Sequence, residues 1–120
     1  MNLLFIHLSF IVDLMEIIFN DAELADLYEG KKITNKIFRS NPPLVKQFIK
    51  VINWLRAINK IEELYQINSL NYEKLIGDWE GYSSVRLNKK YRLIFKEIMS
   101  SKEPFEVLLI AVKEISNHYQ

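Results

Sequence analysis

The chain has 120 residues, of which 49% are hydrophobic, and it contains only three glycines and three prolines. This composition is typical of one folded domain and excludes an extended disordered protein. The absence of cysteine excludes disulfide bonds, thiolate catalysis and cysteine-based metal sites, and it fits the reducing cytoplasm in which we expect the protein to act.

The chain begins with a strongly apolar stretch, residues 1–14, with the sequence MNLLFIHLSFIVDL. It lacks the basic start and the cleavage site of a signal peptide, and it is too short to span a membrane, so we expect no membrane association. It is either an additional packed element or an extension upstream of a natural start at Met15. We favour the second interpretation because MEIIF already has the pattern of a complete first strand, which makes residues 15–120 a single domain.

Two helices are predicted to follow a short strand at Glu16–Phe19. The segment NDAELADLYEG carries a capping residue, Asn20 or Asp21, acidic residues in its first turn and a terminating Gly30. Residues 31–41 are expected to form a basic connector. The second helix begins at the paired prolines 42 and 43, which lack amide hydrogens that the first turn does not need, and its apolar residues recur at helical spacing as far as Ile58.

The C-terminal half is predicted to be a three-stranded antiparallel meander. After Glu62 the chain has the pattern of a loop up to the segment LNYEKLIGDWEG, residues 70–81, in which Leu75 and Ile76 lead into a turn at residues 77–81. Strands are predicted at Tyr82–Leu87, Tyr91–Ile98 and Phe105–Ile115. The third strand alternates at Val107, Leu109, Ala111 and Ile115. The predicted fold is therefore α+β, with both helices packed on one face of the sheet.

Alternation places two sets of side chains on opposite faces of the central hairpin. We expect the core face to carry Val85, Leu87, Leu93 and Phe95. The other face, expected to be open and concave, receives Ser84, Arg86, Arg92 and Lys96. Two arginines on neighbouring strands can bind one phosphate between them, because guanidinium matches phosphate oxygens in a bidentate way. The alternative is an ordinary solvated face.

Basic residues are segregated along the chain even though the formal net charge is only +1. Residues 30–61 contain eight basic residues and no acidic one, and residues 82–96 contain five and none. Such blocks indicate a basic surface suited to phosphate. The first block has the character of an electrostatic docking surface, and the alternative is a solvated helix face.

The order of motifs in the C-terminal half resembles that of the HigB branch of the RelE/ParE toxins of bacterial type II toxin–antitoxin systems. The resemblance rests on Leu75 and Gly77 in EKLIGDWEG, on the strand GYSSVR from Gly81 to Arg86, on the strand YRLIF from Tyr91 to Phe95, and on a polar C-terminus. The first strand and both helices also occur where that family places them. The resemblance implies a RelE-like fold.

The resemblance further implies a toxin that cuts mRNA on the translating ribosome and is neutralised by a helix-turn-helix antitoxin similar to HigA. It assigns the catalytic arginine to Arg92, a second basic residue to Arg86 and a terminal polar cluster to Asn117, His118 and Tyr119. The family ends in Asp-Tyr-His, whereas this chain has Asn-His-Tyr. A shift of one residue on a strand reverses the face of a side chain, so either His118 or Tyr119 is the residue that enters the site.

The implied chemistry is attack of the RNA 2′-hydroxyl on the neighbouring phosphorus, which needs no metal and no cofactor. Arg86 and Arg92 would stabilise the developing charge, and His118 is a natural acid or base because its ordinary pKa lies near neutrality. Contacts to mRNA and ribosomal RNA are predicted for Lys89, Lys90, Lys96, Lys46, Lys50 and Arg39. The two histidines are far apart in sequence, and no motif predicts a metal site.

Two other functions are compatible with the same pattern. One is a ParE-like toxin that binds DNA gyrase and cuts nothing, because one fold carries both activities. The other is an inactive relative that retains antitoxin binding. The two arginines and the terminal histidine favour the nuclease, since a protein that only binds gyrase has no need of an imidazole at that position.

Overall fold

A computed structural model of the chain describes residues 15–117, so the apolar residues 1–14 and the predicted site residues His118 and Tyr119 lie outside the described part. The elements are β1 (Glu16–Phe19), α2 (Ala22–Tyr28), α3 (Lys36–Arg39), α4 (Pro42–Ala57), β2 (Glu73–Lys74), β3 (Ser83–Arg86), β4 (Arg92–Met99) and β5 (Val107–Ser116). Three short 3-10 helices occupy Ile61–Gln66, Asn68–Leu70 and Gly77–Trp79. Within residues 15–117 no helix is long and apolar enough to cross a membrane.

The first and second predicted helices begin where their capping residues indicate. Asp21 caps α2, because its side chain accepts a hydrogen bond from the amide of Glu23 at 2.8 Å. Asn41 caps α4 by accepting from the amide of Leu44 at 3.3 Å, and the two prolines occupy the first turn. The sequence predictions for both helices are confirmed.

The connector between them is more ordered than predicted. Residues 36–39 form α3, which Asn35 caps by accepting a hydrogen bond from the amide of Ile37 at 2.9 Å. This short turn buries the Phe38 side chain, which retains 9% exposure. The tertiary burial of one aromatic ring therefore stabilises a helix that is too short to be recognised from periodicity.

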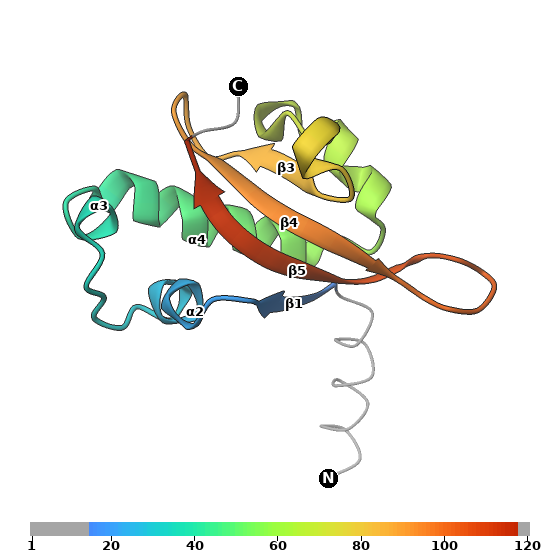
Figure 1. The fold of residues 1–120 in the computed structure, drawn as a ribbon, viewed down its shortest axis with the longest axis horizontal. Helices are drawn as coiled ribbons and strands as arrows, with labels where there is room; N and C mark the ends of the chain where they lie inside the picture. Colours follow the sequence, from blue (N-terminus) through green and yellow to red (C-terminus); the bar gives the residue numbers. More distant parts are fainter. Residues whose placement is uncertain (1–14, 118–120) are drawn as a thin grey trace, which may run out of the picture.

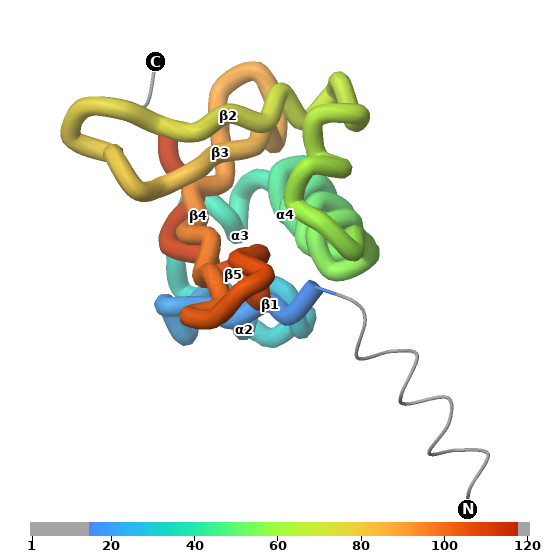
Figure 2. The backbone as a smooth tube through the Cα atoms, turned by 90° about the vertical axis from the view of Figure 1, so that its right-hand side faces the viewer, coloured from blue at the N-terminus to red at the C-terminus, as the bar shows by residue number. Residues whose placement is uncertain are grey.

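The sheet has five strands in the order β1-β5-β4-β3-β2. The predicted meander of β3, β4 and β5 is confirmed as antiparallel, and β1 adds to its far edge parallel to β5. Strand β2, for which the sequence predicted no element, pairs with β3 at the other edge. Figure 1 shows α4 crossing behind the sheet, and in Figure 2 the strands form a column with α4 along one side.

The core lies between α4 and one face of the sheet, as predicted. Val85, Leu87, Leu93 and Phe95 are all buried and belong to the same hydrophobic cluster as Phe48 of α4, which is completely inaccessible. Burying these side chains is the main favourable contribution to folding.

The alternation predicted for the third strand of the meander holds for Val107 and Ile115, which pack against the core, but fails between them. The core cluster contains Ile110 and Val112 of β5, not Leu109 or Ala111. The cause is a pair of register shifts, each of which leaves one additional residue on β5: Met99 pairs with Val107 but Ile98 with Leu109, and Phe95 pairs with Val112 but Ile94 with Glu114. A bulge shifts the alternation of every later residue, so Ile115 returns to the core side.

The second face of the sheet is less open than the alternation predicts. Ser84 and Ile94 on that face have no exposed surface, whereas Arg86 and Lys96 are exposed. Accessible basic groups are therefore found at separate places along this face and not as one continuous concave surface.

Candidate phosphate-binding site

The two predicted arginines face each other across the central hairpin. Arg86 of β3 lies directly opposite Arg92 of β4, and Ser116 of β5 lies opposite Arg92 on its other side. Opposed residues of neighbouring antiparallel strands project from the same face, so the sheet brings both guanidinium groups together. Arg86 is exposed and Arg92 is half-buried.

Arg92 is oriented by hydrogen bonds to two acceptors. Its Nε donates to the Oγ of Ser84 at 2.9 Å, and its Nη2 donates to the main-chain carbonyl oxygen of Asn71 at 2.8 Å. Ser84 is completely buried, so one anchor of the guanidinium cannot exchange for water. The guanidinium group presents N–H donors on separate nitrogens in fixed directions, which suits two separate acceptors. A lysine ammonium has a single nitrogen and does not have this geometry.

The carbonyl of Asn71 reaches Arg92 because this residue adopts a left-handed conformation, with φ 45 and ψ 53. Asparagine enters this region more readily than most residues with a β-carbon. The conformation ends a 3-10 helix and turns the chain into β2. Sequence analysis missed Asn71, because its role depends on a main-chain contact 21 positions away.

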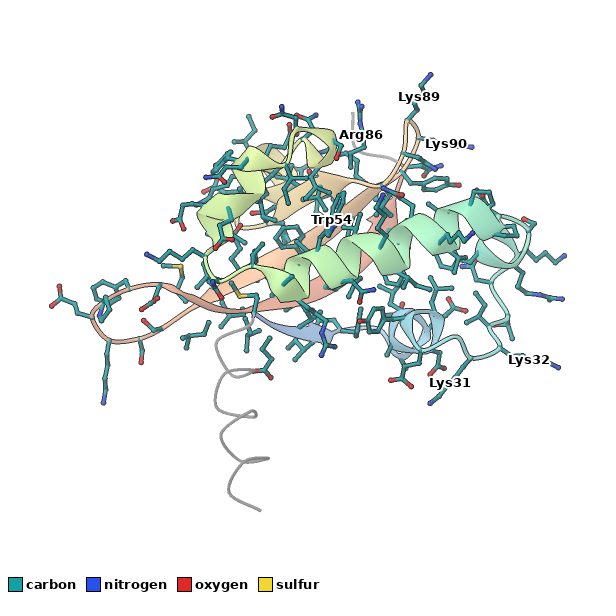
Figure 3. All side chains as sticks on the ribbon, turned by 180° about the vertical axis from the view of Figure 1, so that it is seen from behind. Lys31, Lys32, Trp54, Arg86, Lys89 and Lys90 are labelled. Carbon is teal, nitrogen blue, oxygen red and sulfur yellow. The ribbon has the colours of Figure 1, made fainter. Side chains whose placement is uncertain are left out.

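The turn between β3 and β4 holds two further cations near the arginines. The Oδ1 of Asn88 accepts from the amides of Lys90 at 2.8 Å and Tyr91 at 2.7 Å, a pattern that fixes the turn. Figure 3 shows Lys89 and Lys90 at the tip of this hairpin, close to Arg86. A pocket of ≈ 260 Å³ lies here, lined by Asn71, Glu73, Arg86, Asn88, Lys89, Lys90 and Arg92.

Glu73 is the carboxylate of this basic pocket. It lies on the short strand β2, opposite Ser84, which is the residue that anchors Arg92. Glu73 has no recognisable signal in the sequence, because the two residues of β2 are too few to show a strand periodicity. A strand of two residues is defined by its neighbour, here β3, and not by its own pattern.

The residues of the basic pocket supply two kinds of chemistry. Four cationic side chains can bind a phosphate and stabilise additional negative charge on it. A carboxylate beside them can accept a proton from a nucleophile held at the same phosphate. Among residues 15–117 no group of three histidine, cysteine, aspartate or glutamate residues could hold a metal ion.

The other residues predicted to bind RNA lie outside the basic pocket. Lys96 projects from the same face of the sheet, further along β4. Arg39 lies on α3, and Lys46 and Lys50 lie on α4. The Nζ of Lys50 lies 5.0 Å from the ring centroid of Trp54 on the same helix.

Arg39 and Lys46 instead belong to a separate groove on the helical side, which we call the helical groove. It has a volume of ≈ 1100 Å³, and its floor is formed by the apolar residues Leu27, Ile33, Phe38, Val45 and Ile49. Its edge carries Lys31, Lys32, Arg39 and Lys46. Lys31 is paired with Glu29 at 3.1 Å and Asp26 at 3.9 Å, so acidic residues in and just after α2 neutralise one end of the basic block.

The fold and the basic pocket together define a small α+β domain that presents a phosphate-sized cluster of arginine and lysine at one end of its sheet. The protein-family model described as RelE-like toxin of type II toxin-antitoxin system HigB matches residues 17–102. A search of curated proteins gives no match.

Two solved structures have a similar fold. The YoeB-YefM complex from Staphylococcus aureus is 21% identical, with a TM-score of 0.52, and the match covers 88% of this chain and 98% of that one. The YoeB/ParE toxin from Agrobacterium tumefaciens is 18% identical, with a TM-score of 0.50, and the match covers 88% of this chain and 100% of that one.

The chain belongs to the RelE-like HigB toxins of type II toxin–antitoxin systems. The predicted RelE-like fold is thereby confirmed.

Proposed function

We propose that the chain is an endoribonuclease toxin that cuts mRNA on the translating ribosome without a metal ion. The observation that carries the proposal is the joint placement of Arg86, Arg92 and Glu73 in one basic pocket. Membership of a toxin family that generally carries endoribonuclease activity supports it.

In the proposed reaction the RNA supplies its own nucleophile. The 2′-hydroxyl attacks the adjacent phosphorus, Glu73 accepts the hydroxyl proton, and a new P–O2′ bond forms. The bond from phosphorus to the 5′ oxygen breaks, and this oxygen receives a proton. Arg92 and Arg86 stabilise the additional negative charge on the phosphate.

The proton donor is assigned to the C-terminal pair His118 and Tyr119, either of which can donate to the leaving oxygen. Lys89 and Lys90 are assigned to phosphates that flank the scissile one, where they would bind independently of sequence. Ser84 and Asn71 act through Arg92 and are positioning residues.

The test is cleavage of a translated mRNA in a purified translation system, with and without ribosomes. The full chain is compared with Glu73→Gln, which keeps the size of the side chain but cannot accept the proton, and we expect the rate to fall about 10²–10⁴-fold. Lys102→Ala, in the exposed β4–β5 connection, is the matched control. If the mRNA stays intact and the chain inhibits DNA gyrase, the nuclease proposal is wrong and the ParE-like function is correct.

We also propose that a helix-turn-helix antitoxin similar to HigA neutralises the toxin by placing an acidic amphipathic segment in the helical groove. The groove combines an apolar floor with Lys32, Arg39 and Lys46, which form no salt bridge among the described residues. An apolar floor favours protein over ribosomal RNA, because RNA would leave it without a complementary surface.

The double charge reversal Lys32→Glu/Lys46→Glu tests this partner. We expect it to weaken antitoxin binding, measured by calorimetry, and to leave ribosome binding in a pelleting assay unchanged. Lys60→Glu/Lys102→Glu, at two exposed lysines outside the helical groove, has the same net charge and is the control. Loss of ribosome binding with intact antitoxin binding would reassign the helical groove to ribosomal RNA, as predicted from sequence for Arg39, Lys46 and Lys50.

A further inference from the structure

A second basic cluster lies on the same sheet face as the basic pocket, around Tyr82. The Nζ atoms of Lys96 and Lys113 lie 5.7 Å and 5.6 Å from the centroid of its ring. Trp79 forms a T-shaped pair with the same ring, with the two ring centroids 5.8 Å apart at an interplanar angle of 84°. We call Tyr82, Lys96 and Lys113 the tyrosine subsite.

Strand register explains why these residues meet. Ser83 pairs with Phe95, so continuing the register by one residue places Tyr82 opposite Lys96. Lys113 is the additional residue of the β5 bulge, between Val112 and Glu114. Bulges redirect side chains and are frequent beside active sites, and this one brings Lys113 to the ring of Tyr82.

The electrostatics of the tyrosine subsite favour an anion. Two ammonium groups converge on one ring, and neither forms a salt bridge among residues 15–117. Of the nearby carboxylates, Glu97 already accepts hydrogen bonds from Tyr72 and Ser83, and Glu114 lies on β5 beside Ile94. Each ammonium lies within 5.7 Å of the Tyr82 ring centroid, so a phosphate bound beside the ring would be attracted to both positive charges.

The position relative to the basic pocket suggests which anion binds. Tyr82 and Arg86 are four residues apart, as are Lys96 and Arg92, so the two sites are separated by about 13 Å along the strands. They lie on one face, and between them Ser84 and Ile94 are buried. A single nucleic-acid strand that crosses this face can place one phosphate in each site.

We propose that the tyrosine subsite binds a nucleotide of single-stranded RNA that flanks the scissile phosphate. In the complex the ammonium groups of Lys96 and Lys113 move from the ring of Tyr82 to the phosphate. The ring of Tyr82 then stacks on the base. This inference rests on the proposed nuclease function and assigns to it a binding site for the base next to the scissile phosphate. Base stacking on aromatic rings combined with cationic side chains is the usual arrangement for single-stranded RNA.

The test is equilibrium binding of a short single-stranded 2′-O-methyl RNA, which lacks the attacking hydroxyl, measured by fluorescence anisotropy with the full chain. Tyr82→Leu, which removes the ring, should weaken binding roughly 5- to 150-fold, whereas Tyr82→Phe should bind like the unmodified chain. Lys96→Ala/Lys113→Ala should lower the slope of log affinity against log salt by about 0.7 for each lysine. Tyr65→Leu, at an exposed tyrosine outside both sites, is the matched control.

The outcomes separate the subsite from the nuclease function. Unchanged RNA affinity in Tyr82→Leu, or no RNA binding by the unmodified chain, overturns the subsite even if translated mRNA is cut. Ring-dependent binding without any cleavage supports the subsite and contradicts the nuclease. Thermal unfolding of each variant identifies any variant that fails to fold. If Tyr82→Phe and Tyr82→Leu lower the RNA affinity equally, stacking on the ring is also refuted.

Discussion

The substitution Arg92→Lys separates the geometry of the basic pocket from its charge. Lysine keeps the positive charge but has one nitrogen in place of the two, Nε and Nη2, that donate to Ser84 Oγ at 2.9 Å and to the Asn71 carbonyl oxygen at 2.8 Å, so we expect it to lose at least one of these anchors. A hydrogen bond from a charged donor contributes about 1.5–3 kcal/mol. At 1.36 kcal/mol per factor of ten, loss of one anchor lowers the rate roughly 10- to 150-fold.

Arg92→Lys also loses the bidentate contact to phosphate, so we expect an overall reduction of about 10²–10³-fold in the cleavage rate. The assay is single-turnover cleavage of ribosome-bound mRNA. The salt dependence of RNA binding should remain unchanged, because the charge is conserved.

Arg56→Lys, on α4 and outside both the basic pocket and the helical groove, is the control and should cut at the original rate. Cleavage by Arg92→Lys at a rate close to that of the unmodified chain would show that only charge matters, and the assignment of Ser84 and Asn71 as positioning residues would be abandoned.

Three further predictions concern stability. Burial raises the pKa of Tyr72 above its usual value of 10.0, reinforced by its hydrogen bond to Glu97. The stability that comes from this raised pKa is fully present below pH 10 and is lost as the pH rises toward the pKa of the folded state. Between these values the free energy of unfolding, measured in urea, should therefore fall less in Tyr72→Phe than in the unmodified chain, and the same decrease in both proteins would contradict this. Phe48→Ala should lower the free energy of unfolding by about 3–5 kcal/mol, since Phe48 is completely buried, and a loss below 1 kcal/mol would mean that the cavity collapses. Asn71→Ala should lower the free energy of unfolding by about 1–2 kcal/mol because alanine disfavours the left-handed conformation, whereas Asn71→Gly should not lower it. If thermal unfolding shows the same loss of stability in both variants, the side chain of Asn71 and not its conformation is what stabilises the fold.

Sequence alone determined the features that depend on local patterns. Alternation in the hairpin correctly placed Val85 and Phe95 in the core and both arginines on the other face, because the two-residue period of a strand is a property of each strand. Capping residues and paired prolines correctly located α2 and α4, because they satisfy main-chain groups within one helical turn.

Only the tertiary structure decided how these elements share one site. Strand β2 and its residue Glu73 are defined by pairing with β3, and the anchor from Asn71 to Arg92 spans 21 positions. The two register shifts of β5, one of them at Lys113, arise where β5 pairs with β4, and they change the facing that alternation alone predicts. Contacts of this kind form between segments far apart in the chain, so no periodicity within either segment encodes them.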